Sequence, residues 1–282
     1  MDVAVITDEI SQDLSEAIAV MRRCEVDQAE IRAVGGVNVT DMDDAGVEEV
    51  ASLLRREKIQ VCGLASPFYK CDLFEDQRAE RGMTHQARER SLGEQMDFLM
   101  RCFDIAEKLG TNRIRVFSFW RKGDLTPEIE DRIVEMFAEP VQRATERGME
   151  LLLENEHACF LGTGEETARV LKRLDGAGIA AVWDPGNALC AGENPFPDGY
   201  MAIRPYIRHI HVKDGIRGAD GKVTFCKVGE GQVGYQEHIR QLKRDGYDGL
   251  LSLETHYALE EGGKAAASEE SLRALAAMVR GD

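Results

Sequence analysis

Four short stretches of the sequence end an apolar run with side chains that can bind a metal ion or transfer a proton. They read LLLENEH, AVWDPGN, HIHVKDG and LSLETHY, and they carry Glu154, Asp184, His211 and Glu254. One carboxylate at a strand end is more often a helix cap or a solvated loop residue, but several buried together without a cation would repel one another. We therefore predict that these four residues bind one divalent metal ion.

The ligand set also indicates which metal is favoured. Three carboxylates and one imidazole are rich in oxygen, and such a set suits Mn²⁺ or Mg²⁺ with coordination positions left for water or substrate. Co²⁺ and Zn²⁺ are also compatible with it, whereas a closed thiolate zinc site is not indicated. We predict Mn²⁺ as the preferred cofactor.

Other polar residues near the same strand ends are candidates for proton transfer or substrate binding. His157 follows Glu154 closely and is a candidate catalytic base. The candidate substrate-binding residues are Glu156, Asn187, Lys213, Arg217, Lys70 and His256. Each has a simpler interpretation: Asn187 belongs to a turn-forming Pro-Gly-Asn tripeptide, the cationic residues can be solvated loop charges, and the two histidines can be hydrogen-bonding neighbours of the site. Arg32, at the end of an earlier run, is a further candidate, with a salt bridge as its alternative.

His209 and His211 lie on the same face of one predicted strand, because side chains alternate along a strand. His211 is nearer the carboxyl end of the strand, level with the other three ligands. His209 lies about 6–7 Å deeper. We predict that His209 is a buried, hydrogen-bonded core residue and that His211 is the nitrogen ligand of the metal.

Composition and charge restrict the class of protein. The chain has 282 residues and a formal net charge of −16, which disfavours nucleic acid as a partner. It contains no apolar stretch of 18 residues, so we expect no membrane span, and its acidic N-terminus does not resemble a secretory signal. Seven scattered cysteines without a CxxC pair are typical of reduced thiols. We expect a cytoplasmic protein with a small-molecule partner.

The elements that must position these residues form a repeating pattern. Eight short β-rich runs, at residues 3–6, 28–33, 59–65, 113–119, 149–154, 179–184, 208–212 and 249–254, alternate with segments of helical periodicity. Most runs are apolar throughout, as in parallel sheets buried on both faces. We predict an α/β fold, a (β/α)₈ TIM barrel in a single domain over residues 1–282. A doubly wound open sheet is the alternative, but no GxGxxG follows the first strand. Residues 186–199 are expected to form a long loop.

The combination of LLLENEH, WDPGNAL, HIHVKD, VGEGQVGY and LSLETH resembles the xylose isomerase-like TIM-barrel superfamily over nearly the whole chain. Within it, the sequence looks most like the sugar phosphate isomerase/epimerase group, which includes D-tagatose 3-epimerase, hydroxypyruvate isomerase and inosose dehydratase. The resemblance implies that Glu154, Asp184, His211 and Glu254 bind one catalytic metal, with Glu154 and Glu254 as the acid/base pair. Barrels of this group often pair, so a homo-oligomer is compatible with the resemblance.

The resemblance also implies substrate contacts for Asn187 and Arg217, although the epimerases usually have histidine where Asn187 stands. Endonuclease IV shares the fold, but its trinuclear zinc cluster needs more histidines than the six in this chain supply. The acidic charge disfavours a nuclease for the same reason that it disfavours nucleic acid as a partner.

The predicted chemistry is proton abstraction next to a carbonyl group. We expect a divalent-metal-dependent isomerase or epimerase of a ketose or keto-sugar, which acts through a metal-stabilised enediolate. Metal contact weakens a carboxylate as a base, so His157 is an alternative base. The alternatives are a lyase or dehydratase on a keto-sugar or inosose, and a sugar-binding barrel without catalysis. No phosphate-binding glycine loop is evident, which favours a substrate without phosphate.

Overall fold

Eight parallel strands form a closed barrel in the order β1-β12-β9-β8-β7-β6-β5-β2. The computed structural model describes residues 1–77, 79, 81–174 and 178–281. The barrel strands are β1 Asp2–Ile6, β2 Gln28–Ile31, β5 Gln60–Phe68, β6 Arg113–Val116, β7 Glu150–Glu154, β8 Ile179–Trp183, β9 Ile207–Val212 and β12 Leu250–Leu253. Each of the eight predicted runs overlaps one of these strands, so the predicted (β/α)₈ fold is confirmed.

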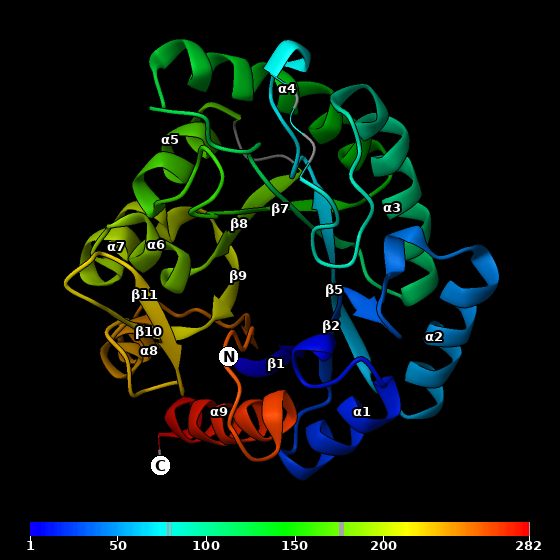
Figure 1. Ribbon diagram of the computed structural model, residues 1–282, viewed down its shortest axis with the longest axis vertical. Coiled ribbons are helices and arrows are strands. Elements are labelled where there is room, and N and C mark those ends of the chain that lie inside the picture. The colour runs from blue at the N-terminus through cyan, green and yellow to red at the C-terminus, as the bar shows by residue number, and fades with distance from the viewer. Residues whose placement is uncertain (78, 80, 175–177, 282) are drawn as a thin grey trace.

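Helices surround the strands on the outside of the barrel, as Figure 1 shows. They are α1 Leu14–Arg23, α2 Asp44–Arg56, α3 Gln95–Leu109, α4 Pro127–Glu146, α5 Gly164–Leu174, α6 Pro185–Ala191, α7 Tyr200–Ile203, α8 Tyr235–Arg244 and α9 Gly263–Arg280. The apolar stripes expected from the sequence form their buried faces, for example Leu14, Ile18 and Met21 in α1. Gly110 ends α3 in the left-handed conformation at φ 81°, a conformation that glycine adopts without steric cost.

Residues 186–199 were predicted to form a loop, and this prediction was wrong for much of the segment. Pro185–Ala191 form α6, Pro195–Gly199 form a short π-helical turn and Tyr200 begins α7. The side chain of Asp184 accepts a hydrogen bond from the backbone N–H of Asn187 at 2.8 Å, which caps the first turn of α6. Pro185 follows at the first helical position, where its missing N–H costs nothing. Capping by Asp184 therefore outweighed the turn preference of Pro-Gly-Asn.

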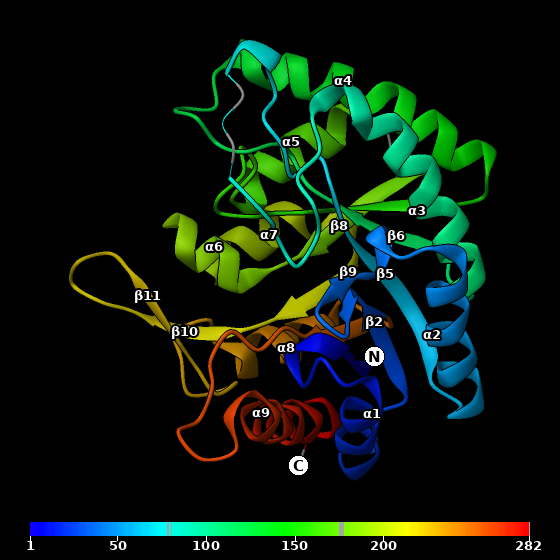
Figure 2. The same cartoon turned by 45° about the vertical axis from the view of Figure 1, so that its right-hand side comes forward.

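Two hairpins extend the barrel. Strands β3 (Ala33–Val34) and β4 (Val37–Asn38) pair after β2, and β10 (Asp214–Arg217) pairs with β11 (Val223–Cys226) after β9. Figure 2 shows β10 and β11 projecting away from the body of the barrel. Short 3₁₀ turns cover Thr7–Glu9, Val39–Asp41, Glu75–Gln77, Leu92–Glu94 and Arg204–Tyr206. Within the described residues, no helix has the length and hydropathy that a membrane crossing requires.

Candidate metal centre

The four predicted metal ligands lie together at the carboxyl ends of four neighbouring strands. Glu154 is the last residue of β7, Asp184 follows β8, His211 is in β9 and Glu254 follows β12. Each offers a ligand atom, and these atoms all lie within 4.8 Å of one another. All four side chains are buried, with residue exposures of 2% or less. The parallel topology brings together residues that are up to 100 positions apart in the chain.

The polar atoms at this point are incompletely paired, which fits a bound cation. Glu154 Oε2, Asp184 Oδ2 and His211 Nδ1 are buried and make no hydrogen bond. Burial raises the pKa of Asp184 to about 6. Burial also disfavours charge on Glu154, but the neighbouring His211 and Arg115 hold its pKa below the ordinary value. Two of these oxygens still face a cationic side chain, because Asp184 Oδ2 lies 2.9 Å from Lys213 Nζ and Glu154 Oε2 lies 3.4 Å from Arg115 Nη1. Carboxylate oxygens and an imidazole nitrogen are also the donors that suit a divalent cation.

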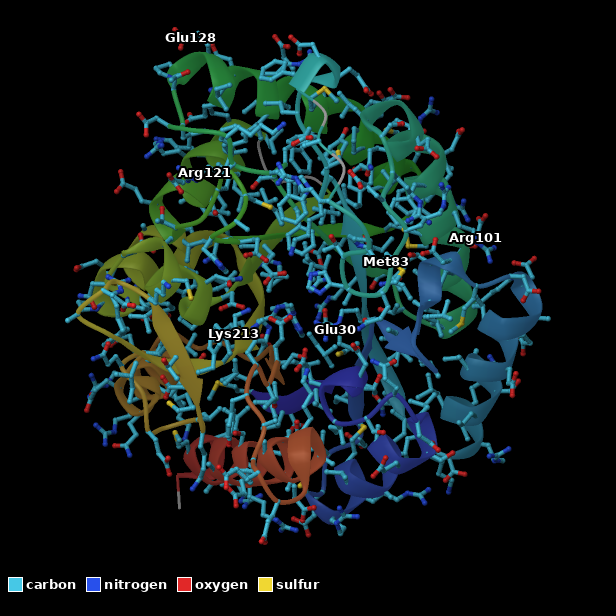
Figure 3. All side chains as sticks on the ribbon, viewed as in Figure 1. Glu30, Met83, Arg101, Arg121, Glu128 and Lys213 are labelled. Carbon is cyan, nitrogen blue, oxygen red and sulfur yellow. The ribbon has the colours of Figure 1, made fainter. Side chains whose placement is uncertain are left out.

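Lys213 lies inside this cluster. Its ammonium is 2.7 Å from Glu254 Oε2 and 2.9 Å from Asp184 Oδ2. Although burial opposes it, these carboxylates hold the pKa of Lys213 well above its ordinary range. Lys213 was predicted as a substrate-binding residue, and the structure places it directly against two of the proposed metal ligands. Figure 3 labels it close to the middle of the barrel.

Two arginines from the first half of the chain also face the cluster. Arg32 donates to Glu254 Oε1 at 2.9 Å, and it also pairs with Asp8 and Glu9. Arg115 Nη1 lies 3.4 Å from Glu154 Oε2. The salt-bridge interpretation of Arg32 is thus confirmed. The sequence did not single out Arg115, although a charged residue in the middle of the apolar run RIRVFSF was a usable signal.

A chain of hydrogen bonds connects Glu154 with the more exposed part of the site. Asn187 donates from Nδ2 to Glu154 Oε1 at 3.0 Å, and its Oδ1 lies 3.2 Å from His157 Nδ1. His157 Nδ1 is also 2.9 Å from Glu156 Oε1, and this contact raises the pKa of His157. Lys70 donates to Glu156 Oε2 at 2.8 Å. Five predicted site residues are therefore neighbours in one network.

The ammonium group of Lys70 contacts a histidine and an aromatic ring in addition to Glu156. Its ammonium is 2.9 Å from His85 Nε2 and 4.2 Å from the centre of the Phe117 ring. Burial and the neighbouring Lys70 hold the pKa of His85 well below its ordinary range, so the imidazole is neutral and accepts from the ammonium. His85 was not predicted, because it belongs to the long loop between β5 and α3 and follows no strand.

Arg217 and His256 lie at the edge of the centre. The guanidinium atoms Nε and Nη2 of Arg217 are buried without a hydrogen-bond partner, so these donors remain for a ligand. His256 Nε2 is 3.6 Å from Glu254 Oε1, and its ring meets Phe225 edge-on at 4.8 Å. His256 is thus a neighbour of a proposed metal ligand, which is the alternative to substrate binding given for it in the sequence analysis.

The glycine-containing loop 228–235 is occupied by a side chain of the protein. The carboxylate of Asp214 accepts hydrogen bonds from the backbone N–H groups of Gly229, Gly231 and Val233 at 2.9, 3.1 and 3.2 Å. A Cβ atom on Gly231 would lie only 2.1 Å from Asp214 Oδ1, so the loop needs glycine there. These amides, which form the kind of concave cluster that binds anions, are already satisfied.

Glu30 is a further buried residue next to the centre that the sequence analysis did not predict. Its carboxylate lies 3.0 Å from His211 Nε2 and 3.1 Å from His209 Nε2. Burial opposes ionisation, but the two imidazoles hold the pKa of Glu30 well below its ordinary range. The prediction that His209 is a buried, hydrogen-bonded core residue is confirmed. A glutamate inside the apolar run QAEIRA was the available signal.

Similar solved structures share the fold at low sequence identity. A structure of IolI with a bound zinc atom is 15% identical and has a TM-score of 0.77, covering 100% of this chain and 99% of its own. An L-ribulose 3-epimerase is 13% identical with a TM-score of 0.73, covering 100% and 95%. AsbF of Bacillus anthracis, a probable 3-DHS dehydratase, is 17% identical with a TM-score of 0.72, covering 99% of both chains.

Sequence comparison identifies the family. An uncharacterized protein of Methanocaldococcus jannaschii, MJ1311, is 33% identical over 132 residues, which are 45% of this chain and 44% of that protein. The chain thus matches less than half the length of this curated relative. The family model for the xylose isomerase-like TIM barrel matches residues 18–278. Because this match covers most of the sequence and the barrel is closed as the family requires, the chain belongs to the xylose isomerase-like TIM-barrel family.

Proposed function

We propose that this protein is a divalent-metal-dependent isomerase or epimerase of a ketose or keto-sugar, with Mn²⁺ as the preferred ion. The observation that carries the proposal is the cluster of Glu154, Asp184, His211 and Glu254, whose ligand atoms lie within 4.8 Å of one another and include buried atoms that make no hydrogen bond. A divalent cation bound there would stabilise the enediolate that forms when a sugar C–H next to a carbonyl loses its proton.

The two glutamates are suited to move that proton. Neighbouring cations hold the pKa of Glu154 below the ordinary value and that of Glu254 well below it, although burial opposes both shifts. Both are therefore carboxylates that can accept a proton. They come from β7 and from the end of β12, and His211 Nδ1 lies between them, at 3.3 and 3.8 Å. One takes the proton and the other returns it to the substrate, at the same carbon or at its neighbour.

The proposed roles of the two glutamates are supported by a hydrogen-bond network at the open side of the site, formed by Asn187, His157 and Glu156. Asn187 orients the Glu154 carboxylate by its hydrogen bond, and His157 holds Asn187 in turn. Arg217 offers buried, unpaired guanidinium donors to substrate oxygens. Lys70 and His256 complete the proposed contacts with a small carbohydrate.

The substrate we propose carries no phosphate. The amide groups of loop 228–235 that could bind a phosphate are used by the Asp214 carboxylate. A phosphate at that position would have to displace a buried negative charge held by four backbone N–H bonds, including that of Gly215. A neutral ketose or keto-sugar requires no such rearrangement.

A second candidate function is a lyase or dehydratase that acts on a keto-sugar or inosose, including elimination from a 3-keto-glycoside. It is favoured by His157, whose side chain is 44% exposed and whose pKa is raised by the hydrogen bond to Glu156. An imidazolium at the open side of the site can protonate a departing hydroxyl or alkoxide. The two structural neighbours described as an epimerase and a dehydratase illustrate that this fold accommodates both outcomes.

The experiment that tests the function is metal analysis followed by incubation with Mn²⁺ in deuterated water and a panel of ketoses and keto-cyclitols. Deuterium at a sugar carbon without elimination supports the isomerase or epimerase, and an unsaturated product supports the lyase. If neither forms and no metal binds, the proposal is wrong and a sugar-binding barrel without catalysis remains.

Substitution of one acid/base residue gives a sharper prediction. We expect Glu154→Gln to lower turnover by about a hundredfold or more, because an amide accepts no proton. The matched control is Glu150→Gln, which makes the same change at the opposite end of β7, where Glu150 contacts Arg113. Full activity and full metal content in Glu154→Gln would contradict the assignment of the site.

A further inference from the structure

Glu30 lies inside the barrel, behind the proposed metal ligands. It comes from β2 and is 2% exposed. Its Oε2 atom lies 3.0 Å from His211 Nε2, 3.1 Å from His209 Nε2 and 3.0 Å from Ser252 Oγ, and its Oε1 atom lies 3.2 Å from His211 Nε2. Figure 3 labels Glu30 near the middle of the barrel, as it does Lys213. Three groups from β9 and β12 therefore converge on one carboxylate.

These contacts determine which nitrogen of His211 carries a hydrogen. An ionised carboxylate only accepts hydrogen bonds, so the Nε2 atom that faces both oxygens of Glu30 must be an N–H group. This holds whether the ring is neutral or charged. The other ring nitrogen, Nδ1, faces Glu154 Oε1 at 3.3 Å and is without a hydrogen bond. In the neutral ring, Nδ1 is then the atom with a free lone pair.

We propose that Glu30 is a positioning residue that holds His211 in the Nε2–H tautomer and presents Nδ1 to the metal. This inference rests on the proposed function, since it concerns the same metal. A carboxylate on the far nitrogen fixes the orientation of a metal-binding imidazole and increases its basicity. Glu30 faces Nε2, whereas Glu154 and Glu254 face Nδ1, and this is the arrangement that the role requires.

Glu30, His209 and His211 also satisfy the distance criterion for a second metal site. The hydrogen bonds favour the positioning role, because each imidazole presents Nε2 to a carboxylate at an ordinary hydrogen-bond distance, and Ser252 donates to the same oxygen. These contacts satisfy the carboxylate of Glu30 without a cation. The number of metal ions bound by the wild-type protein distinguishes the two arrangements.

The test compares wild type with Glu30→Gln, using Zn²⁺ as the probe. Affinity and stoichiometry are measured by competition with a chromophoric chelator, and ¹⁵N–¹H correlations of the histidine rings identify which nitrogen of His211 carries hydrogen. In Glu30→Gln, an NH₂ group replaces one carboxylate oxygen, and this group cannot accept a hydrogen bond from His211. We expect Zn²⁺ affinity to fall by about 10- to 100-fold, with loss of the Nε2–H signal of His211.

The matched control is Ser252→Ala, which removes a different donor from the same carboxylate and leaves His211 in contact with Glu30. We expect it to weaken Zn²⁺ binding less than Glu30→Gln and to keep the Nε2–H signal. If Glu30→Gln does not fold, the wild-type zinc complex still decides, because coordination of His211 through Nε2 would overturn the inference.

The remaining outcomes separate this inference from the proposed function. Wild-type protein that binds no Zn²⁺ contradicts the proposed function, and the inference falls with it. Wild-type protein that binds one ion, together with unchanged affinity and an unchanged His211 tautomer in Glu30→Gln, contradicts only the inference. If the wild-type protein binds two ions and His209→Gln binds only one, Glu30 is a metal ligand. This outcome would also overturn the inference.

Discussion

Lys213 supplies positive charge to the carboxylates that we propose as metal ligands. Its ammonium contacts Asp184 and Glu254, and the residue is 3% exposed. Without that charge, the three buried carboxylates would keep the contacts of His211, Arg32 and Arg115 and the hydrogen bonds that Asn187 donates to Glu154 and Asp184. A buried carboxylate that loses its cation is strongly disfavoured. We therefore expect the side chain to stabilise the metal-free protein and to compete with the proposed metal ion for the same carboxylates.

Replacing Lys213 by methionine tests this competition. We expect Lys213→Met to lower the free energy of unfolding of metal-free protein by about 3–5 kcal/mol, because it leaves buried carboxylates unpaired. We also expect it to bind Mn²⁺ more tightly than wild type. Urea unfolding with a chelator and Mn²⁺ titration measure the two effects. The control is Lys227→Met, which removes a surface lysine paired with Glu230. Weaker Mn²⁺ binding in Lys213→Met would show that the lysine assists the metal.

The clustering of the four proposed ligand residues could be predicted from the sequence, but the residues that contact them could not. Glu154, Asp184, His211 and Glu254 end apolar runs, and parallel strands bring such ends to one face. Glu30 and Arg115 lie inside strands, where the sequence does not show whether a side chain points inward or which residue it meets. His85 comes from a loop whose path depends on tertiary packing. The local pattern thus predicted the residues that form the cluster, whereas the network around them depends on the folded chain.

At the scale of elements, a cluster of aromatic rings joins α8 to β8. His238 of α8 accepts a hydrogen bond from Trp183 Nε1 at 3.2 Å, and the rings of Phe196 and Tyr200 pack against it at 5.3 and 4.8 Å. Burial lowers the pKa of His238 to about 3. The folded protein therefore keeps this histidine neutral in mildly acidic solution, while the unfolded chain protonates it near its ordinary pKa of about 6.5.

This packing gives a pH dependence of known sign. As the pH falls from about 6.5 toward 3, His238 is protonated in the unfolded chain but stays neutral in the folded protein. The free energy of unfolding therefore decreases by up to about 1.4 kcal/mol per pH unit. His238→Gln keeps an acceptor for the indole N–H but does not titrate. We expect wild type to lose stability relative to this variant between pH 6.5 and pH 4, measured by urea unfolding. A constant difference between the two would contradict the prediction.

Most helices were predictable from the spacing of their apolar residues, and α6 was the exception. Only seven residues long, it has no amphipathic stripe of its own, and Pro-Gly-Asn favours a turn in isolation. Asp184 and Pro185 were nonetheless an ordinary start signal for a helix. The predicted role of Asp184 in the cluster accounts for only one of its oxygens: Oδ2 faces the cluster, whereas Oδ1 caps the helix.

At the scale of the whole molecule, the proposed metal would connect four of the eight strands. Its ligands come from β7, β8, β9 and β12, which are adjacent in the barrel. The regular alternation of runs and helical segments made the barrel predictable, because few other folds use eight such units. The hairpins β3–β4 and β10–β11 were not predicted, since they are short insertions that the barrel pattern does not require.

Metal binding should therefore stabilise the barrel as a unit. A ligand that binds only the folded state at 100 times its Kd adds about 2.7 kcal/mol to the free energy of unfolding. We expect Mn²⁺ to raise the thermal midpoint of wild type and a chelator to reverse the change. Asp184→Asn should respond much less, because it lacks one carboxylate. An equal response of both proteins would place the stabilising ion elsewhere.

The order of the residues around the barrel has a consequence for how such a site can diverge. The proposed ligands lie in or directly after the last four barrel strands, and Lys213 and Asn187, which contact them, follow two of the same strands. Glu30, Arg32 and Arg115, which also contact them, lie in or directly after two of the first four strands. Substitutions of Glu30, Arg32 or Arg115 would therefore change the charge around the proposed ligands while every proposed ligand stays in place, which is one way in which a reaction could change at a conserved centre.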